Sequence, residues 1–304
     1  MTVGCLVLFF LSNNPNQRVS PRESYNYVPR PDPRISPRGS FDYKAPDPGA
    51  SVSDVDDFSL PYATSPLSRD SVDACYAEWG QVTERKAGNK QLPKSSLRED
   101  VTLYNEFFKK GALLGKSGFY LELGGFDGVA ESNSRFYERC LGWSGLLIEA
   151  SPKMFPKLAK NRPLAHKLHV SPTCPDESGV ITFLPSSFTN AMIYDPDNKD
   201  HKKFASNTVD VRCGPLKKYI SELGVKHIDL FSLDVEGAEL MVLQNFDFSA
   251  VSVDVVMVES DNAYHKSNDE GNMEIRRLMR EAGFVLKKSL VQKSDVYVRE
   301  GFVY

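Results

Sequence analysis

Short apolar runs alternate with segments of helical spacing over residues 118–259, and most of the runs end in a glycine or an acidic residue. Because the buried strands of a parallel sheet are apolar on both faces, these runs predict strands at 118–124, 144–150, 165–171, 227–235 and 253–259. The periodic segments between them predict helices at 131–141, 152–161, 214–224 and from 238 onward. Strands that alternate with helices indicate a parallel, doubly wound α/β sheet with right-handed crossovers.

Two strand-like runs close the chain. They follow a helix predicted at 271–282, span 284–291 and 295–299, and are joined by a predicted turn at Lys293–Ser294. Such a pair forms a hairpin, so one edge of the sheet becomes antiparallel. The predicted fold is therefore a seven-stranded, mostly parallel sheet with an antiparallel C-terminal hairpin strand and helices on both faces.

Two further strand-like runs lie between the third and fourth strands of the sheet. Residues 179–184 alternate and predict an extra strand, and residues 208–213 predict another. Residues 185–206 have no period and predict a long loop. Loops of that length in compact domains are often functional or mobile.

The beginning of the chain is apolar but short. Residues 3–11 form an apolar run of nine residues, whereas a membrane span needs about 20, and no basic stretch precedes the run. The run is a truncated signal peptide or signal-anchor, an unusual targeting segment, or an apolar start without a targeting role. A signal-anchor predicts a secretory or membrane-anchored protein with membrane association through residues 3–11, and the last alternative predicts a cytoplasmic one.

A proline-rich segment separates this start from the folded part. Residues 12–70 hold ten of the 19 prolines, and proline with polar filler buries little apolar surface, so we expect a disordered linker. The helical spacing of 95–114, with Ser96 and Glu99 as a capping box, begins the folded domain. The predicted divisions are an apolar segment, a linker, an approach segment with at most one helix, and the domain: 1–11, 12–70, 71–95 and 96–304.

Charge and cysteine content exclude some classes of function. The net charge of −3 and the pI of about 6.0 provide no overall attraction to nucleic acid or anionic membranes. The five cysteines include no CxxC pair and no metal-like spacing with the five histidines, so we expect no structural zinc and assign no metal ligands.

The most informative stretch is the turn GFYLELGGFDG at 118–128. Its glycines do not match the G-x-G-x-x-G pattern that seats a dinucleotide pyrophosphate. Glu149 ends the next strand, 21 residues after Gly128, where such folds hold a ribose. Glu122 can accept from an ammonium, and helix N-terminal amides near Asn133 can meet a carboxylate. S-adenosylmethionine has all three groups. The alternative is that Glu122 only caps the strand end and Glu149 faces solvent.

Acids at the ends of later strands predict the reacting side of the pocket. Asp234 and Glu236 lie at the end of the strand at 227–235 and would shape the pocket around the sulfonium and the acceptor, or take a proton. Alternatively, Glu236 complements the dipole of the following helix. His265, in the loop after the strand at 253–259, is a second candidate base, or an exposed loop histidine.

These residues resemble the FkbM family of S-adenosylmethionine-dependent methyltransferases, and the sequence motifs are similar to those of its eukaryotic branch. The matching segments cover about residues 117–262: YLELGGFDGVAESN, GWSGLLIEASPKMFPKLAKNR, HVS…SGVITF, and IDLFSLDVEGAELMVLQNFDF followed by VVMVES. The resemblance implies a Rossmann-like methyltransferase sheet, S-adenosylmethionine as cofactor, and O-methylation of a small-molecule or glycan acceptor. It implicates Glu122, Gly124, Asp127, Gly128, Asn133, Glu149, Ser171 and Asp234 in cofactor binding, and Asp234, Glu236 and His265 in catalysis.

The chain also departs from the family pattern. Phe126 stands where many methyltransferases have the middle glycine of the turn. Some eukaryotic relatives serve trafficking, so a catalytically inactive binding module is the alternative function. Another nucleotide-using α/β enzyme is a third possibility, and the missing G-x-G-x-x-G and P-loop lysine argue against it. Relatives often carry cysteines near Cys174 and Cys213, which either pair or stay as free buried thiols.

Overall fold

The computed structural model describes residues 30–31, 43–44, 69–81, 94–175, 179–184, 192–197, 199–261 and 269–303. The predicted segment 1–11, most of the predicted linker and His265 lie outside these ranges. Within them, no helix combines the length and the apolar character needed to span a membrane.

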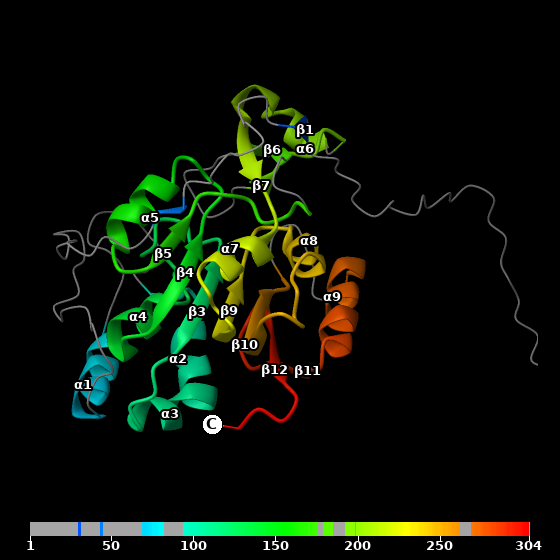
Figure 1. Ribbon diagram of the computed structural model, residues 1–304. Helices are drawn as coiled ribbons and strands as arrows, with labels where there is room; N and C mark the ends of the chain where they lie inside the picture. The colour runs from blue at the N-terminus through cyan, green and yellow to red at the C-terminus, as the bar shows by residue number, and fades with distance from the viewer. Residues whose placement is uncertain are drawn as a thin grey trace, which may run out of the picture.

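A central sheet organises the molecule, with its strands in the order β11-β12-β10-β9-β3-β4-β5 (Figure 1). The strands are β3 (Phe119–Leu123), β4 (Ser144–Ile148), β5 (His166–Leu168), β9 (His227–Leu233), β10 (Ser252–Glu259), β11 (Phe284–Lys287) and β12 (Ser294–Arg299). The first five pair in parallel and the last two are antiparallel, which confirms the predicted seven-stranded sheet. A two-residue strand, β2 (Tyr43–Lys44), adds to the β5 edge.

The hairpin that closes the sheet differs from the prediction in its connection. We expected a tight turn at Lys293–Ser294, but β11 ends at Lys287 and six residues join it to β12. The longer loop brings the backbone of Lys293 to the end of β10, where its carbonyl accepts from the amides of Ser260 and Asp261 at 2.8 and 3.0 Å. The hairpin loop therefore reaches the carboxyl end of the parallel strands.

Helices cover both faces of the sheet (Figure 1). One face carries α1 (Arg69–Gly80), α2 (Glu99–Leu103), α3 (Lys109–Leu113), α4 (Arg135–Leu141) and α5 (Phe155–Asn161), and the other carries α7 (Leu216–Glu222), α8 (Glu239–Gln244) and α9 (Glu270–Glu281). Because successive strand residues point to opposite faces, Tyr120 packs into the first core and its neighbour Leu121 into the second.

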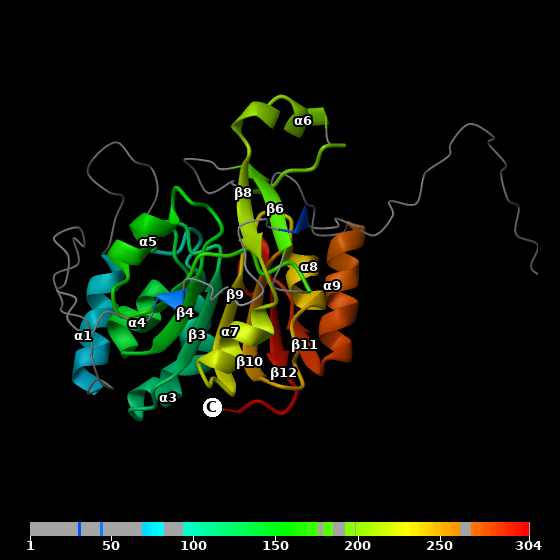
Figure 2. The same cartoon turned by 45° about the horizontal axis from the view of Figure 1, so that its top comes forward.

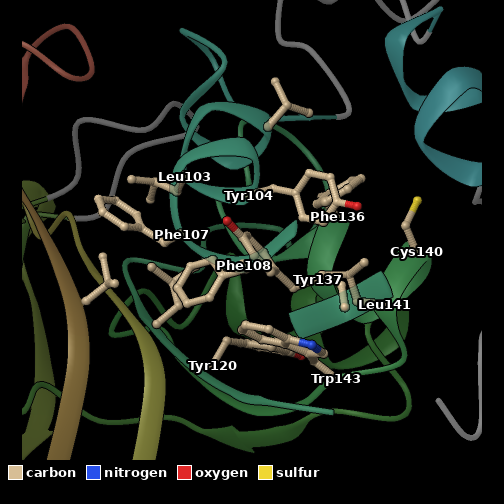
Figure 3. Packing of buried hydrophobic residues seen from close by; sticks show 14 of the residues in the cluster. Leu103, Tyr104, Phe107, Phe108, Tyr120, Phe136, Tyr137, Cys140, Leu141 and Trp143 are labelled. Atoms are coloured by element: carbon tan, nitrogen blue, oxygen red, sulfur yellow. The ribbon is translucent and has the colours of Figure 1, made fainter. Parts of the chain in front are cut away.

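Aromatic side chains dominate the first core (Figure 3). The ring of Phe108 meets those of Tyr137 and Trp143 edge-on, with centroids 5.7 and 5.1 Å apart. Helix α1 is part of this core, since Trp79 is fully buried against Phe136 and a disulfide joins Cys75 to Cys140. The stretch predicted only as an approach segment thus contributes to the described core.

The helix predicted at 95–114 is continuous but changes pitch, because a π-helical turn at Tyr104–Phe108 separates α2 from α3. The predicted capping box of Ser96 and Glu99 is wrong. Instead, Ser95 Oγ donates to Asp100 Oδ1 at 2.5 Å, and Trp79 Nε1 donates to Asp100 Oδ2 at 2.8 Å. The buried carboxylate of Asp100 therefore binds both the segment before α2, through Ser95, and helix α1, through Trp79.

A second, small sheet stands above the carboxyl ends of the central strands (Figures 1 and 2). It pairs β6 (Gly179–Leu184) antiparallel with β8 (Val209–Cys213), β7 (Met192–Ile193) and β1 (Arg30–Pro31). The two extra strands were predicted, but their pairing was not. The segment predicted as a loop at 185–206 contains β7 and α6 (Lys199–Lys202), and a 3₁₀ turn at Ala205–Asn207 crosses its end. A disulfide between Cys174 and Cys213 ties this sheet to the segment after β5.

Replacing Cys75 and Cys140 together by alanine should lower the free energy of unfolding by about 2–4 kcal/mol, because the bond closes a long loop in the unfolded chain. The cysteines are 65 residues apart. Denaturant unfolding without reductant measures the loss, and reductant added to the natural protein should produce a loss at least as large. Equal unfolding midpoints for the two oxidised proteins would contradict the disulfide.

Candidate active site

A cavity of about 340 Å³ opens at the carboxyl ends of β3, β4, β9 and β10. The chain runs outward from β3 through β4 to β5 and then returns to β9, so the strand order reverses between β3 and β9. Ligands of doubly wound sheets bind at this reversal. Phe183 and Ile193 of the small sheet also line the cavity, so that sheet forms one of its walls. The volume lies within the range of about 300–1,000 Å³ that is usual for ligand pockets.

The glycine turn after β3 serves the packing of the protein itself. Gly124 has φ +82°, and a side chain there would lie 1.7 Å from the carbonyl oxygen of Asp234. The amides of Gly124 and Gly125 both donate to the carbonyl of Ile148, at 3.0 and 3.1 Å. These glycines allow the ends of β3, β4 and β9 to meet, and their amides are already occupied by protein.

Phe126, the departure from the family pattern, adopts the left-handed conformation that glycine would favour, with φ 47°. Its amide donates to Glu149 Oε2 at 2.7 Å. Glu131 and Glu236 also have positive φ, at 58° and 53°, and all three residues line the cavity. Strained backbone of this kind persists only where its surroundings enforce it, and it gathers at functional sites.

Glu122 is buried beneath the turn and is held by three donors. Its Oε1 accepts from the Asn133 amide at 2.8 Å, and its Oε2 accepts from the hydroxyls of Ser132 (3.0 Å) and Ser134. An ionised carboxylate has about four acceptor positions, so one remains. The amide that was expected to meet a ligand carboxylate is thus taken by Glu122, and the main partner of Glu122 is the protein.

Asp127 and Gly128 lie beneath the turn and do not line the cavity. Asp127 Oδ1 accepts from the amides of Val129 and Ala130 at 2.9 and 2.8 Å, so this carboxylate caps the segment that follows the turn. A side chain at Gly128 would lie 2.7 Å from Cγ of Arg162. Both residues therefore shape the turn from below.

Glu149 is positioned to face a ligand. It is buried at the end of β4 and lines the cavity, and each carboxylate oxygen accepts from one amide: Oε2 from Phe126 and Oε1 from Ser151, at 2.7 and 2.6 Å. The Ala150 amide adds a smaller stabilisation of the charged form, and among the described residues each oxygen has one close amide donor and one further acceptor position. Burial raises the pKa of Glu149 to about 7, and the backbone hydrogen bonds oppose that rise. A ligand with two hydroxyl donors would complete this site.

Two residues at the end of α5, which sequence reasoning did not select, hold the turn in place. Asn161 Nδ2 donates to the carbonyl of Asp127 at 2.8 Å, and Arg162 Nη1 donates to the carbonyl of Gly128 at 3.1 Å. Arg162 Nη2 also donates to Glu138 Oε2 and Tyr120 Oη, both at 2.9 Å. The pKa of Arg162 is raised well above its usual range by Glu138 and Tyr120, which outweigh its burial. The sequence signal, a polar Asn-Arg pair ending an amphipathic helix, resembles an ordinary helix end.

Acids crowd the other side of the cavity, at the ends of β9 and β10. Burial raises the pKa of Asp234 well above its usual range, and the nearby Glu259, Glu236 and Glu239 raise it further. Burial, with Glu259 and Glu239 nearby, raises the pKa of Glu236 to about 8, while Lys293 opposes the rise. The carboxyl groups of Asp234 and Glu236 therefore keep their protons up to a higher pH than exposed carboxyl groups do.

Among the described residues, two groups of side chains bring three potential metal ligands together. Asp234, Glu239 and Glu259 have carboxylate oxygens within 4.8 Å of one another, a donor set of the kind that Mg²⁺ or Ca²⁺ prefers. The second group, His227, Asp229 and Asp254, lies at the opposite end of the sheet, and each of its members already binds a protein group.

The cavity collects most of the predicted site residues. Those that line it are Glu122, Gly124, Asn133, Glu149, Ser171, Asp234 and Glu236. Ser171 is buried, and its hydroxyl shares a 3.1 Å hydrogen bond with that of Thr173. Asp127 and Gly128 support the turn, and His265 lies outside the described residues. The sequence alone did not show which of these residues line the cavity and which support the turn beneath it.

A family model described as a methyltransferase FkbM domain matches residues 122–286, which is more than half of the chain. No curated protein matches the sequence. Three similar solved structures are a TehB-like SAM-dependent methyltransferase from Corynebacterium glutamicum, Aeropyrum pernix fibrillarin with natively bound S-adenosyl-L-methionine, and precorrin-6y C5,15-methyltransferase from Geobacter metallireducens. Their identities are 10%, 10% and 9% and their TM-scores 0.39, 0.34 and 0.33. The alignments cover 75%, 59% and 72% of this chain and 98%, 65% and 91% of theirs. With TM-scores below 0.5, these likenesses carry no functional conclusion.

Gly124→Ala should cost about 3 kcal/mol or more of unfolding free energy, because the new methyl group meets backbone that cannot move aside. Gly224→Ala is the matched control: Gly224 also has a positive φ, of +69°, but nothing lies within 4 Å of its Cβ position. Its cost should be only the conformational strain of about 1–2 kcal/mol. Denaturant unfolding compares the two, and equal losses would contradict the close approach at Gly124.

Proposed function

The chain belongs to the FkbM methyltransferase family, and on that premise we propose that it methylates a hydroxyl group of a small-molecule or glycan acceptor with S-adenosylmethionine. The observation that carries the proposal is Glu149, a buried carboxylate with open acceptor positions at the end of β4. It lies in a cavity at the reversal of the strand order, where a nucleoside is held in such folds.

The residues present suit this cofactor. Glu149 can accept from both ribose hydroxyls, and the buried hydroxyl of Ser151, which also lines the cavity, has no hydrogen-bond partner among the described residues. Glu122 keeps one acceptor position for the ammonium, and Glu131 and Glu236 add further carboxyl groups to the cavity lining. When bound, the cofactor supplies a methyl group on a positively charged sulfur.

The acidic residues at the ends of β9 and β10 would bind the methyl acceptor. Methyl transfer to oxygen is an in-line displacement, so most of the rate comes from positioning and electrostatics. In this proposal Asp234 or Glu236 binds the acceptor hydroxyl and takes its proton. A pKa of about 8 makes Glu236 a stronger base, once ionised, than an exposed carboxylate would be. His265 remains a further candidate base from the sequence.

The charge of the cavity narrows the choice of acceptor. The acidic residues that line it are Glu99, Glu122, Glu131, Glu149, Asp234, Glu236 and Glu259. The cationic side chain among the described lining residues is Lys293. Like charges repel strongly in a site of low dielectric constant. A neutral or amine-bearing hydroxyl compound therefore suits the cavity better than a phosphorylated, sulfated or carboxylated one.

The remaining sequence predictions enter the proposal unchanged. We propose no nucleic-acid partner, no route to membrane association other than residues 3–11, and membership of the eukaryotic branch of the family. The two disulfides, Cys75–Cys140 and Cys174–Cys213, support an oxidising compartment such as the secretory pathway, since thiols stay reduced in the cytoplasm.

Affinity for S-adenosylhomocysteine should rise between pH 6 and pH 8. Free Glu149 has a pKa of about 7, and donation from two ribose hydroxyls stabilises its ionised form. Below pH 7 binding must therefore release a proton, which weakens it by up to about tenfold per pH unit. Calorimetry in buffers of different ionisation enthalpy measures the affinity and the proton release. Glu149→Gln should remove most of this dependence, and equal slopes for the two proteins would contradict the role of Glu149.

Neutral and amine-bearing hydroxylated acceptors should be methylated at least about tenfold faster than their phosphorylated or sulfated counterparts, since one close like-charge pair costs more than about 1.4 kcal/mol in a buried site. Mass detection of methyl transfer across matched acceptor pairs measures the ratio. A preference for the anionic member of each pair would contradict it. Cofactor binding with no transfer to any class would favour the alternative of an inactive binding module.

A further inference from the structure

The hydroxyl group of Ser151 makes no hydrogen bond to the described part of the protein. The residue is fully buried, and its Oγ has no hydrogen-bond partner among the described residues. Such a group costs about 1–3 kcal/mol of folding free energy, so buried hydroxyls without partners are uncommon in native proteins. Ser151 is also one of the residues that line the cavity.

The backbone of Ser151, unlike its side chain, is fully used. Its amide donates to Glu149 Oε1 at 2.6 Å, and its carbonyl accepts from the amides of Met154 and Phe155 at 3.1 and 2.9 Å. A serine before a helix commonly caps it with its side chain. Here the first residue before α5 is Met154, and no side-chain hydrogen bond caps the helix. Helix capping therefore does not explain the serine.

A second buried hydroxyl provides the comparison. Tyr104 Oη also has no partner among the described residues, but Tyr104 lies within the aromatic core and does not line the cavity. Its ring packs against that of Phe136 (Figure 3) and against that of Tyr76, with centroids 5.1 and 5.4 Å apart. Two similar groups thus differ in that Ser151 borders the cavity and Tyr104 does not.

From this placement we infer that Ser151 positions the cofactor, by a hydrogen bond between its hydroxyl and one ribose hydroxyl group. Glu149 can only accept when it is ionised, whereas a serine hydroxyl both donates and accepts. The short bond from the Ser151 amide to Glu149 couples the two residues, so the diol meets a carboxylate and a hydroxyl on adjoining backbone. This inference rests on the proposed function, because it assumes a nucleoside in the cavity.

Ser151→Ala tests the inference on the full chain, with Tyr104→Phe as the matched control. Both changes remove a buried hydroxyl without a described partner, so neither should lower the unfolding midpoint. Only Ser151→Ala should weaken S-adenosylhomocysteine binding, by about five- to tenfold in calorimetry, the value of one hydrogen bond. Equal affinities of the natural protein and Ser151→Ala, or equal losses in both variants, would overturn the role of Ser151.

Competition with adenosine and 2′,3′-dideoxyadenosine locates the bond. Ser151→Ala should weaken the competition of adenosine against S-adenosylhomocysteine binding and leave the competition of 2′,3′-dideoxyadenosine unchanged. Equal reductions would place the bond outside the ribose and overturn the assignment. If the natural protein binds no S-adenosylhomocysteine at millimolar concentration, the proposed function itself fails. If the natural protein and Ser151→Ala bind it equally well, only the role of Ser151 fails.

Discussion

The buried guanidinium of Arg162 is the contact on which the glycine turn depends. It reaches from the end of α5 to the carbonyl of Gly128, the hydroxyls of Ser132 and Ser134, and the carboxylate of Glu138. Removing one partner of such a buried pair commonly costs about 3–5 kcal/mol, because the other charge is left without compensation. The turn and the helix after it are therefore held from beneath, and the cavity above them need not be filled for them to be ordered.

This support divides the acids of the site into two groups. Glu122, Asp127 and Glu138 are buried, and each accepts hydrogen bonds from donors of the protein. Glu149 and Glu236 line the cavity, and burial raises their pKa values to about 7 and about 8. Burial disfavours the charged form of such a carboxylate, and further hydrogen bonds from a ligand would favour it. The first group builds the site, and the second is available to react.

Much of the fold followed from local pattern. All seven strands of the central sheet were predicted, and β3, β4 and β10 were evident from apolar runs, because a strand buried on both faces is largely apolar. The carboxyl-end position of Glu149 and Asp234 followed as well, since parallel strands end at one edge. The pairing of β6 with β8 was missed, as was the disulfide between Cys75 and Cys140, because both join segments far apart in the chain and have no period of their own.

The site shows the same division between local and distant effects. The sequence by itself determined the family, the parallel sheet, and the acids at the ends of its strands, because hydrophobic periodicity and strand order act over short distances. Only the tertiary structure decided which acids face a ligand. Glu122 and Glu149 both end apolar strands, but donors from the helix start surround the first, and the second keeps acceptor positions open. The fate of a buried carboxylate depends on donors brought to it from other segments, and no pattern around the residue itself records them.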